Sequence, residues 1–112
     1  HDDVEKAADM VRMALGFYIG GMGAREVNFH ADLFSRMGYE EDVERIQDLF
    51  LSGRKEEAIA SVPLALVEDV ALVGPEDKIR EDLERWRETC LTTLLVAAAP
   101  HQMRQIADLV RG

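Results

Sequence analysis

The glycine-rich run Gly20-Gly21-Met22-Gly23 is the first feature of the sequence that could do chemistry, because such runs can cradle phosphate groups. A dinucleotide-binding glycine motif has to follow a strand and open a helix. Here the residues before the run have helical spacing, so the run predicts a tight bend at the end of a helix. Arg25 follows it and is a candidate contact for an anion.

The other reactive side chains are isolated in the sequence. His30 could donate a proton and His101 could face a ligand, but neither has a sequence neighbour that would orient or activate it, so each is predicted to be structural or solvated. Cys90 is the single cysteine and can form no internal disulfide. No group of residues has the spacing of a metal site or of a nucleophile motif. A complete catalytic site therefore cannot be assembled from this sequence.

The composition limits the class of protein. With 112 residues and 47% hydrophobic content, the chain can bury one modest core. Its net charge of -9 repels phosphate backbones and anionic lipids, which predicts neither a nucleic-acid nor a membrane partner. The single cysteine favours a reducing, cytoplasmic setting. The acidic N-terminus lacks the pattern of a signal peptide and is expected not to be the natural start of the protein.

Residues 1–69 are predicted to be helical, because apolar residues recur there every three or four positions. A second apolar stripe formed by Phe29, Leu33 and Met37 predicts that its segment is buried on more than one side. The expected helices cover residues 4–19, 27–37, 40–51 and 55–61, with one more helical turn in 63–68.

Residues 70–112 predict the order strand, helix, strand, helix. The runs 70–73 and 91–97 are continuously apolar, as buried parallel strands are, and helices are expected to start at Pro75 and Pro100. Two strands are too few for a parallel sheet, which needs neighbours and covering helices. The chain is therefore predicted to be a mostly helical piece of a larger α/β protein, with two short parallel strands.

Several short segments of the chain match one family pattern in the order of that family. They are Tyr18 to Arg25, Asn28 to His30, Arg36 to Glu40, Ile46 to Leu49, Gly53 to Lys55, Val70 to Glu76 and Thr92 to Val96. Through them the chain resembles the C-terminal part of the luciferase-like flavin and deazaflavin oxidoreductases. Cys90-Leu91 departs from that pattern, where family members more often have Gly-Val, which predicts a locally different turn.

The resemblance implies a TIM barrel, the (β/α)8 fold, in which residues 70–73 and 91–97 are strands seven and eight. Residues 1–69 would then be a late helical insertion, and residues 70–112 the last two βα units. The subgroup that the chain resembles most is described as coenzyme F420-dependent, which implies hydride transfer through a deazaflavin. Related members use FMN and oxygen.

The resemblance also implies site residues. Barrels commonly hold phosphate in the loops after strands seven and eight, where helix N-termini point at the ligand. This makes Gly74 and Pro75, and Ala98 and Ala99 ahead of Pro100, candidate cofactor-binding residues. A purely structural role for these residues is favoured, because Gly-Pro is also an ordinary turn and Glu76 would repel a phosphate. The run at residues 20–23 and Arg25 would form the edge of a substrate pocket.

Two functions remain open at this point. The first is the C-terminal portion of an oxidoreductase that is inactive alone, holds no cofactor alone, and has the remainder of its own barrel as partner. The second is a stand-alone helical interaction module without catalysis. Without the other strands, the apolar segment 91–97 is expected either to pair with residues 70–73 and a symmetry mate, which gives a homo-oligomer, or to abandon sheet pairing for the helical core, and the first outcome is favoured.

Overall fold

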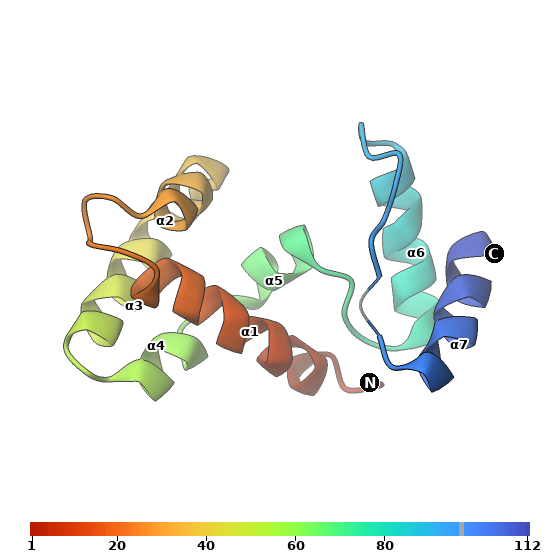
Figure 1. Cartoon of the computed structure of the whole chain (residues 1–112), viewed down its shortest axis with the longest axis horizontal. Coiled ribbons are helices and arrows are strands. Elements are labelled where there is room, and N and C mark those ends of the chain that lie inside the picture. The colour runs from red at the N-terminus through yellow and green to blue at the C-terminus, as the bar shows by residue number, and fades with distance from the viewer. Residues whose placement is uncertain (97) are drawn as a thin grey trace.

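The chain folds into a cluster of packed helices that is joined to a separate pair of helices (Figure 1). The computed structural model describes residues 1–96 and 98–112. The cluster contains α1 (Val4–Gly21), α2 (Phe29–Phe34), the π-helical turn η1 (Ser35–Tyr39), α3 (Glu40–Leu51), α4 (Lys55–Ala60) and α5 (Leu64–Val70), and the pair contains α6 (Glu76–Arg87) and α7 (Pro100–Arg111).

Two glycines one turn apart determine how α1 packs against α3 and α4. Gly16 and Gly20 lie on the buried face of α1. A Cβ atom on Gly20 would lie 2.5 Å from Cγ of Phe50 in α3, and one on Gly16 would lie 2.9 Å from Cγ1 of Ile59 in α4. Both distances are well inside van der Waals contact. The absence of side chains at these positions therefore allows α3 and α4 to approach the backbone of α1.

The hydrophobic core lies within the cluster of α1 to α5. Arg12 crosses its edge, where Nε donates a hydrogen bond to the carbonyl oxygen of Val62 at 3.0 Å and the guanidinium pairs with Glu5 and Asp9. The core thus joins elements that are distant in sequence. Its buried residues are Ala8, Leu15, Ile19, Ala31, Phe34, Val43, Ile46, Ala58, Val62, Leu66, Val67 and Val73.

An ion-pair cluster joins α6 to α5. The Lys78 ammonium on α6 lies 3.0 Å from the Glu68 carboxylate on α5 and 2.6 Å from the Asp82 carboxylate on its own helix. The hydrogen bond between Lys78 and Asp82 raises the pKa of Lys78 and lowers the pKa of Asp82, against the opposing effect of burial. Because all three side chains are half-buried, solvent screens these charges less than at an open surface. The cluster therefore helps to hold α6 against the helical core.

The two predicted parallel strands are not formed, so this part of the sequence-based prediction is wrong. Val70 is the last residue of α5, and Ala71 has extended angles but belongs to no sheet. Residues 91–96 run beside α6 and α7 as an irregular segment in which Leu95 is 97% exposed, and Ala97 lies outside the described residues. A strand needs neighbours to pair its backbone N–H and C=O groups, and the described part of the chain supplies none.

The chain reverses its direction twice in this region, although only the two predicted helices are formed. In Figure 1, α6 runs upward, the segment that contains residues 91–96 returns downward, and α7 runs upward again. In the turn after α6, Thr89 and Cys90 have negative φ angles, and Thr89 Oγ1 donates a hydrogen bond to the Trp86 carbonyl oxygen at 2.7 Å. The two helices therefore lie parallel, as helices do in consecutive βα units.

The predicted helices differ from the observed ones mainly at their ends. The spacing correctly predicted α3, while α1 extends two residues further than predicted. The expected helix 27–37 starts at Phe29 and passes into η1, where Gly38 has a φ of 104°. The prediction that this segment is buried on more than one side is wrong, because Phe29, Leu33 and Met37 are exposed. Nothing in the described structure covers their side of α2.

The glycine packing gives a first prediction. Gly20→Ala should lower the free energy of unfolding by about 1–3 kcal/mol, because the added methyl group overlaps Phe50. Chemical denaturation followed by circular dichroism measures this. Met13→Ala on the exposed side of α1 is the control, with an expected change within about 0.5 kcal/mol. Helix propensity alone would make Gly20→Ala more stable by about 1 kcal/mol, and that result would contradict the packing described here.

The ion-pair cluster gives a second prediction. Lys78→Met should cost about 1 kcal/mol at neutral pH, since Glu68 loses its cation and Asp82 keeps only Arg85. The pKa of Asp82 is lowered in the folded chain, so its stabilising contribution is present above its ordinary pKa and is lost as the pH falls through the lowered one.

Urea unfolding of Lys78→Met and of the parent chain, at neutral and at strongly acidic pH, should therefore give a difference that shrinks in acid. Arg80→Met, which breaks the exposed pair with Glu76, is the matched control on the same helix and should have little effect. A difference for Lys78→Met that is equal at both pH values would argue against the ion-pair cluster.

Candidate functional site

Asn28 joins the end of α1 to the start of α2. Its side chain is buried, and Nδ2 donates hydrogen bonds to the carbonyl oxygens of Tyr18 at 3.1 Å and Ile19 at 2.8 Å. Oδ1 accepts a hydrogen bond from the Ala31 amide at 3.0 Å, which caps α2. One amide side chain thus satisfies carbonyls in the last turns of α1 and an amide in the first turn of α2.

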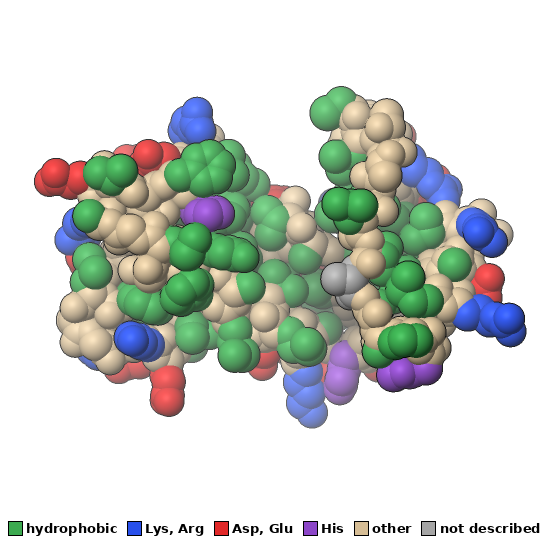
Figure 2. All heavy atoms as spheres, viewed as in Figure 1, with side chains coloured by type: hydrophobic (Ala, Val, Ile, Leu, Met, Phe, Trp, Pro, Cys, Tyr) green, Lys and Arg blue, Asp and Glu red, His purple; other side chains and the backbone are tan. Residues whose placement is uncertain are grey.

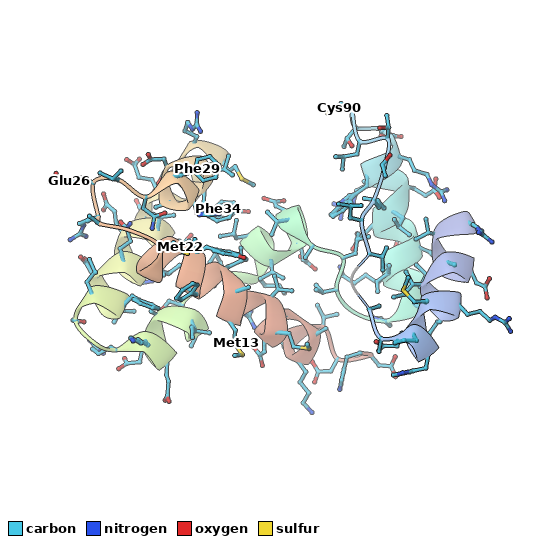
Figure 3. The ribbon with its side chains drawn as sticks, in the orientation of Figure 1. Met13, Met22, Glu26, Phe29, Phe34 and Cys90 are labelled. Carbon is cyan, nitrogen blue, oxygen red and sulfur yellow. The ribbon has the colours of Figure 1, made fainter. Side chains whose placement is uncertain are left out.

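The Asn28 contacts place three rings together, which we call the aromatic corner: Tyr18, Phe29 and His30. The rings of Tyr18 and His30 are stacked, with centroids 4.6 Å apart and planes inclined by 14°. Phe29 meets His30 edge-on at 5.0 Å and is itself largely exposed. In Figure 3, Phe29 lies at the start of α2, and Met22 lies nearby at the end of α1. The corner offers an apolar, partly exposed surface.

The glycine run forms the predicted bend at the end of α1. Gly20 and Gly21 are the last residues of the helix and Met22 is its C-cap. Gly23 has a φ of 120°, and a Cβ atom there would lie 2.8 Å from the Val27 carbonyl oxygen. Only glycine fits this turn without strain. The run therefore turns the chain from α1 to Asn28 and borders the aromatic corner.

Arg25 lies in the loop after the bend. Its guanidinium pairs with the Asp48 carboxylate of α3, and both side chains are at least half exposed. An anion at this position would compete with Asp48 for the guanidinium. Arg25 and the glycine run lie in the same loop region, as the sequence suggested.

The four predicted cofactor-binding residues lie at the starts of α6 and α7. Pro75 and Ala99 are the N-caps of these helices, and neither side chain caps a backbone amide. Gly74 has a φ of 119°, and a Cβ atom there would lie 3.0 Å from Lys78 Cδ and 3.1 Å from Val4 Cγ2, so a larger residue would be strained and would displace these side chains. Both helices start at the lower end of the view in Figure 1, so their positive ends lie at one end of this helix pair.

The two helix starts differ in charge. Glu76 and Asp77 lie in the first turn of α6, where they already interact favourably with the helix dipole. The first turn of α7 has no acidic residue and contains His101, which is exposed. The α7 start, beside Ala98 and Ala99, is therefore the more favourable of the two for an anion.

A groove of about 350 Å³ separates the segment 91–96 from α6 and α7. This groove was not predicted from the sequence, although the apolar faces of the two helices indicate that a further layer must cover them. The groove is mainly apolar, and its lining includes Leu83, Trp86, Leu91, Leu94, Met103, Ile106 and Val110.

Two other features were not predicted from the sequence: the cap that Asn28 forms on α2, and the stack of the Tyr18 and His30 rings. Asn28 could have been found, because asparagine is a preferred N-cap and stands directly before the apolar helix α2. The Tyr18–His30 stack could not, because its rings are twelve positions apart and meet only through the bend. His30 therefore has an oriented neighbour that the sequence did not reveal.

Within residues 1–96 and 98–112, no group of three or more histidine, cysteine, aspartate or glutamate side chains could hold a metal ion. Among these same residues, no helix has both the length and the apolar character to cross a bilayer.

The role of Asn28 gives a third prediction. Asn28→Ala should lower the free energy of unfolding by about 2–3 kcal/mol, because it leaves two carbonyl oxygens and the Ala31 amide without their partner. Asn28→Asp keeps the cap but faces the same carbonyls with a carboxylate, and should be at least as destabilising as Asn28→Ala near neutral pH. Thermal and urea unfolding test the pair. An aspartate variant as stable as the parent chain would refute this role.

The chain was compared with known proteins. The family model described as luciferase-like monooxygenase matches residues 1–93. A protein of Mycobacterium tuberculosis (strain ATCC 25618 / H37Rv), named a putative coenzyme F420-dependent oxidoreductase, is 42% identical over 110 residues. The match covers 97% of this chain but 32% of that relative, so the chain spans about a third of the relative's length. No solved structure matches. The match over residues 1–93 shows that the chain belongs to the luciferase-like monooxygenase family.

Proposed function

We propose that this chain is the C-terminal portion of an oxidoreductase that transfers hydride between the deazaflavin coenzyme F420 and an organic substrate in the cytoplasm. The observation that carries the proposal is the 42% identity to a relative whose name includes coenzyme F420. The aligned region covers 97% of this chain and so spans nearly all the candidate site residues. The alternative cofactor is FMN, favoured by the match to luciferase-like monooxygenases.

The chain's share of cofactor binding would come from two helix starts. The amides at the start of α7, next to Ala98 and Ala99, would donate hydrogen bonds to a cofactor phosphate, with Gly74 and Pro75 at the neighbouring helix start. Both starts lie at one end of the helix pair (Figure 1). The deazaflavin itself supplies the hydride chemistry when bound.

The chain's share of substrate binding would come from the aromatic corner and the bend beside it. Tyr18, Phe29 and His30 give an apolar wall, and residues 20–23 with Arg25 form its border. Asn28 would hold this wall in place through its three hydrogen bonds. An organic substrate with an apolar face suits such a wall.

The isolated chain should be inactive and should hold no cofactor on its own. In the proposed full-length enzyme, residues 1–69 would be a helical insertion and residues 70–112 the last two βα units of a (β/α)8 barrel. The backbone of residues 91–96 would then pair with strands of the remaining barrel, which is the expected partner. Without that partner, self-association through the same segment is the competing outcome.

A stand-alone interaction module is the second candidate function. It is favoured by the number of exposed apolar side chains, including Met10, Val27, Phe29 and Leu95. A module of this kind would form a discrete complex and bind neither F420 nor FMN.

The proposed function is tested with a chimera in which this chain replaces the matching third of the M. tuberculosis relative. The chimera should reduce or oxidise F420 with an organic substrate, as measured by the coenzyme's absorbance, and the isolated chain should not. FMN is the parallel arm of the assay. A folded chimera that binds neither coenzyme, beside an isolated chain that forms a discrete oligomer, would favour the interaction module.

One variant tests the helix-start assignment in the same chimera. Ala99→Glu places a carboxylate at the start of α7 and should raise the KM for F420 about tenfold, because it repels the cofactor phosphate. Gln105→Glu makes the same charge change on an exposed position further along α7 and is the control. Equal effects of the two variants would remove α7 from the cofactor site.

A further inference from the structure

The helix α1 has two apolar faces, and the described structure covers only one of them. Ala8, Leu15 and Ile19 are buried in the core. On the opposite side, apolar residues repeat at positions 10, 13, 14 and 17, the three-and-four spacing of a packed helical face. We call this set the outer stripe: Met10, Met13, Ala14 and Phe17.

The outer stripe is open to solvent. Met10 is 79% exposed, Met13 63% and Phe17 49%. Burying one such side chain is worth about 1.5–3 kcal/mol, so a stripe of this kind is costly to leave in water. Figure 2 shows hydrophobic side chains gathered over the α1 and α2 side of this face, with charged side chains mainly toward its edges.

The sequence of α1 also has the character of a buried helix. Charged residues make up 31% of the chain, yet none occurs between Arg12 and Arg25. The second half of α1 is therefore apolar or glycine on every side. Helices that are hydrophobic all round are found in the interior of proteins. A solvated outer face would carry charges, as the outer face of α6 does with Glu76 and Arg80.

We propose that the outer stripe packs against polypeptide that corresponds to the part of the family's length missing from this chain. This inference rests on the proposed function, in which the chain is one portion of a longer enzyme. The match covers 97% of this chain but 32% of the relative, so about two thirds of the relative's length is available as the covering layer. Met13 lies at the centre of the stripe and projects from α1 in Figure 3, so it is the position at which burial is tested.

A second copy of the chain is the less favoured occupant. Each copy has a net charge of -9, so pairing two copies brings like charges together. Charge therefore argues against self-pairing through this face.

Thiol labelling tests the proposal directly. The single natural thiol is removed by Cys90→Ser, and Met13→Cys is introduced both in the isolated chain and in the chimera with the rest of the M. tuberculosis relative. Met13→Cys should react with a maleimide at least about tenfold more slowly in the chimera than in the isolated chain. Leu91→Cys, in the segment proposed to pair with the barrel, should also be protected, while Arg80→Cys on the charged face of α6 should label rapidly in both.

Two results would overturn the inference. Equal labelling rates of Met13→Cys in the chain and in a chimera that protects Leu91→Cys would leave the outer stripe exposed in the longer protein. Slow labelling in the isolated chain, together with a dimer by light scattering that Met10→Glu dissociates, would identify a second copy as the occupant. Hydride transfer is not measured in this experiment, so a chimera without F420 activity can still support or refute the covered stripe.

Discussion

The close approach of α3 and α4 to the glycine face of α1 is the constraint on which the rest of the helical cluster depends. Phe50 and Ile59 lie where Cβ atoms on Gly20 and Gly16 would be. This contact brings residues from three helices into one core, and it fixes the side of α1 that is buried. The opposite side is then fixed as well, because a helix buried along one face presents the other outward. The exposure of Met10 and Met13 follows from the position of the two glycines.

The same contact determines where the candidate site can form. Once the last turn of α1 is held against Phe50, the bend at residues 21–23 starts from a defined position, and Asn28 can reach the carbonyl oxygens of Tyr18 and Ile19. Asn28 then orients α2, and through it the stack of His30 on Tyr18. The position of the bend thus depends on the packing of α1 against Phe50, and the hydrogen bonds of Asn28 depend on the bend. A ring on a surface loop would lose more conformational freedom on ligand binding than rings held in this way.

Much of the helical part of the fold could be predicted from the sequence, and the reason is physical. Helix hydrogen bonds join residues four positions apart, so periodicity and caps contain most of the information needed for α3, whose bounds were predicted correctly. The prediction that Phe29, Leu33 and Met37 are buried was wrong, because burial depends on whether another element packs against their side of the helix. The bend at residues 20–23 was expected from glycine chemistry, whereas the Tyr18–His30 contact required the folded arrangement. The roles of Gly74, Pro75, Ala98 and Ala99 stay predictions, since they depend on a ligand.

The segment 91–96 differs from the helices beside it in where its backbone groups can find hydrogen-bond partners. A helix pairs its own backbone groups, so α6 and α7 form in this chain and lie parallel to one another. A parallel strand forms its backbone hydrogen bonds with neighbouring strands that are distant in sequence. In such a sheet, the apolar side chains of residues 91–96 would also be buried under covering helices. The segment instead lies open beside a groove lined by Trp86 and Met103. The helices α6 and α7 can therefore form from local hydrogen bonds alone, whereas a strand over residues 91–96 would need neighbours that the described residues do not supply.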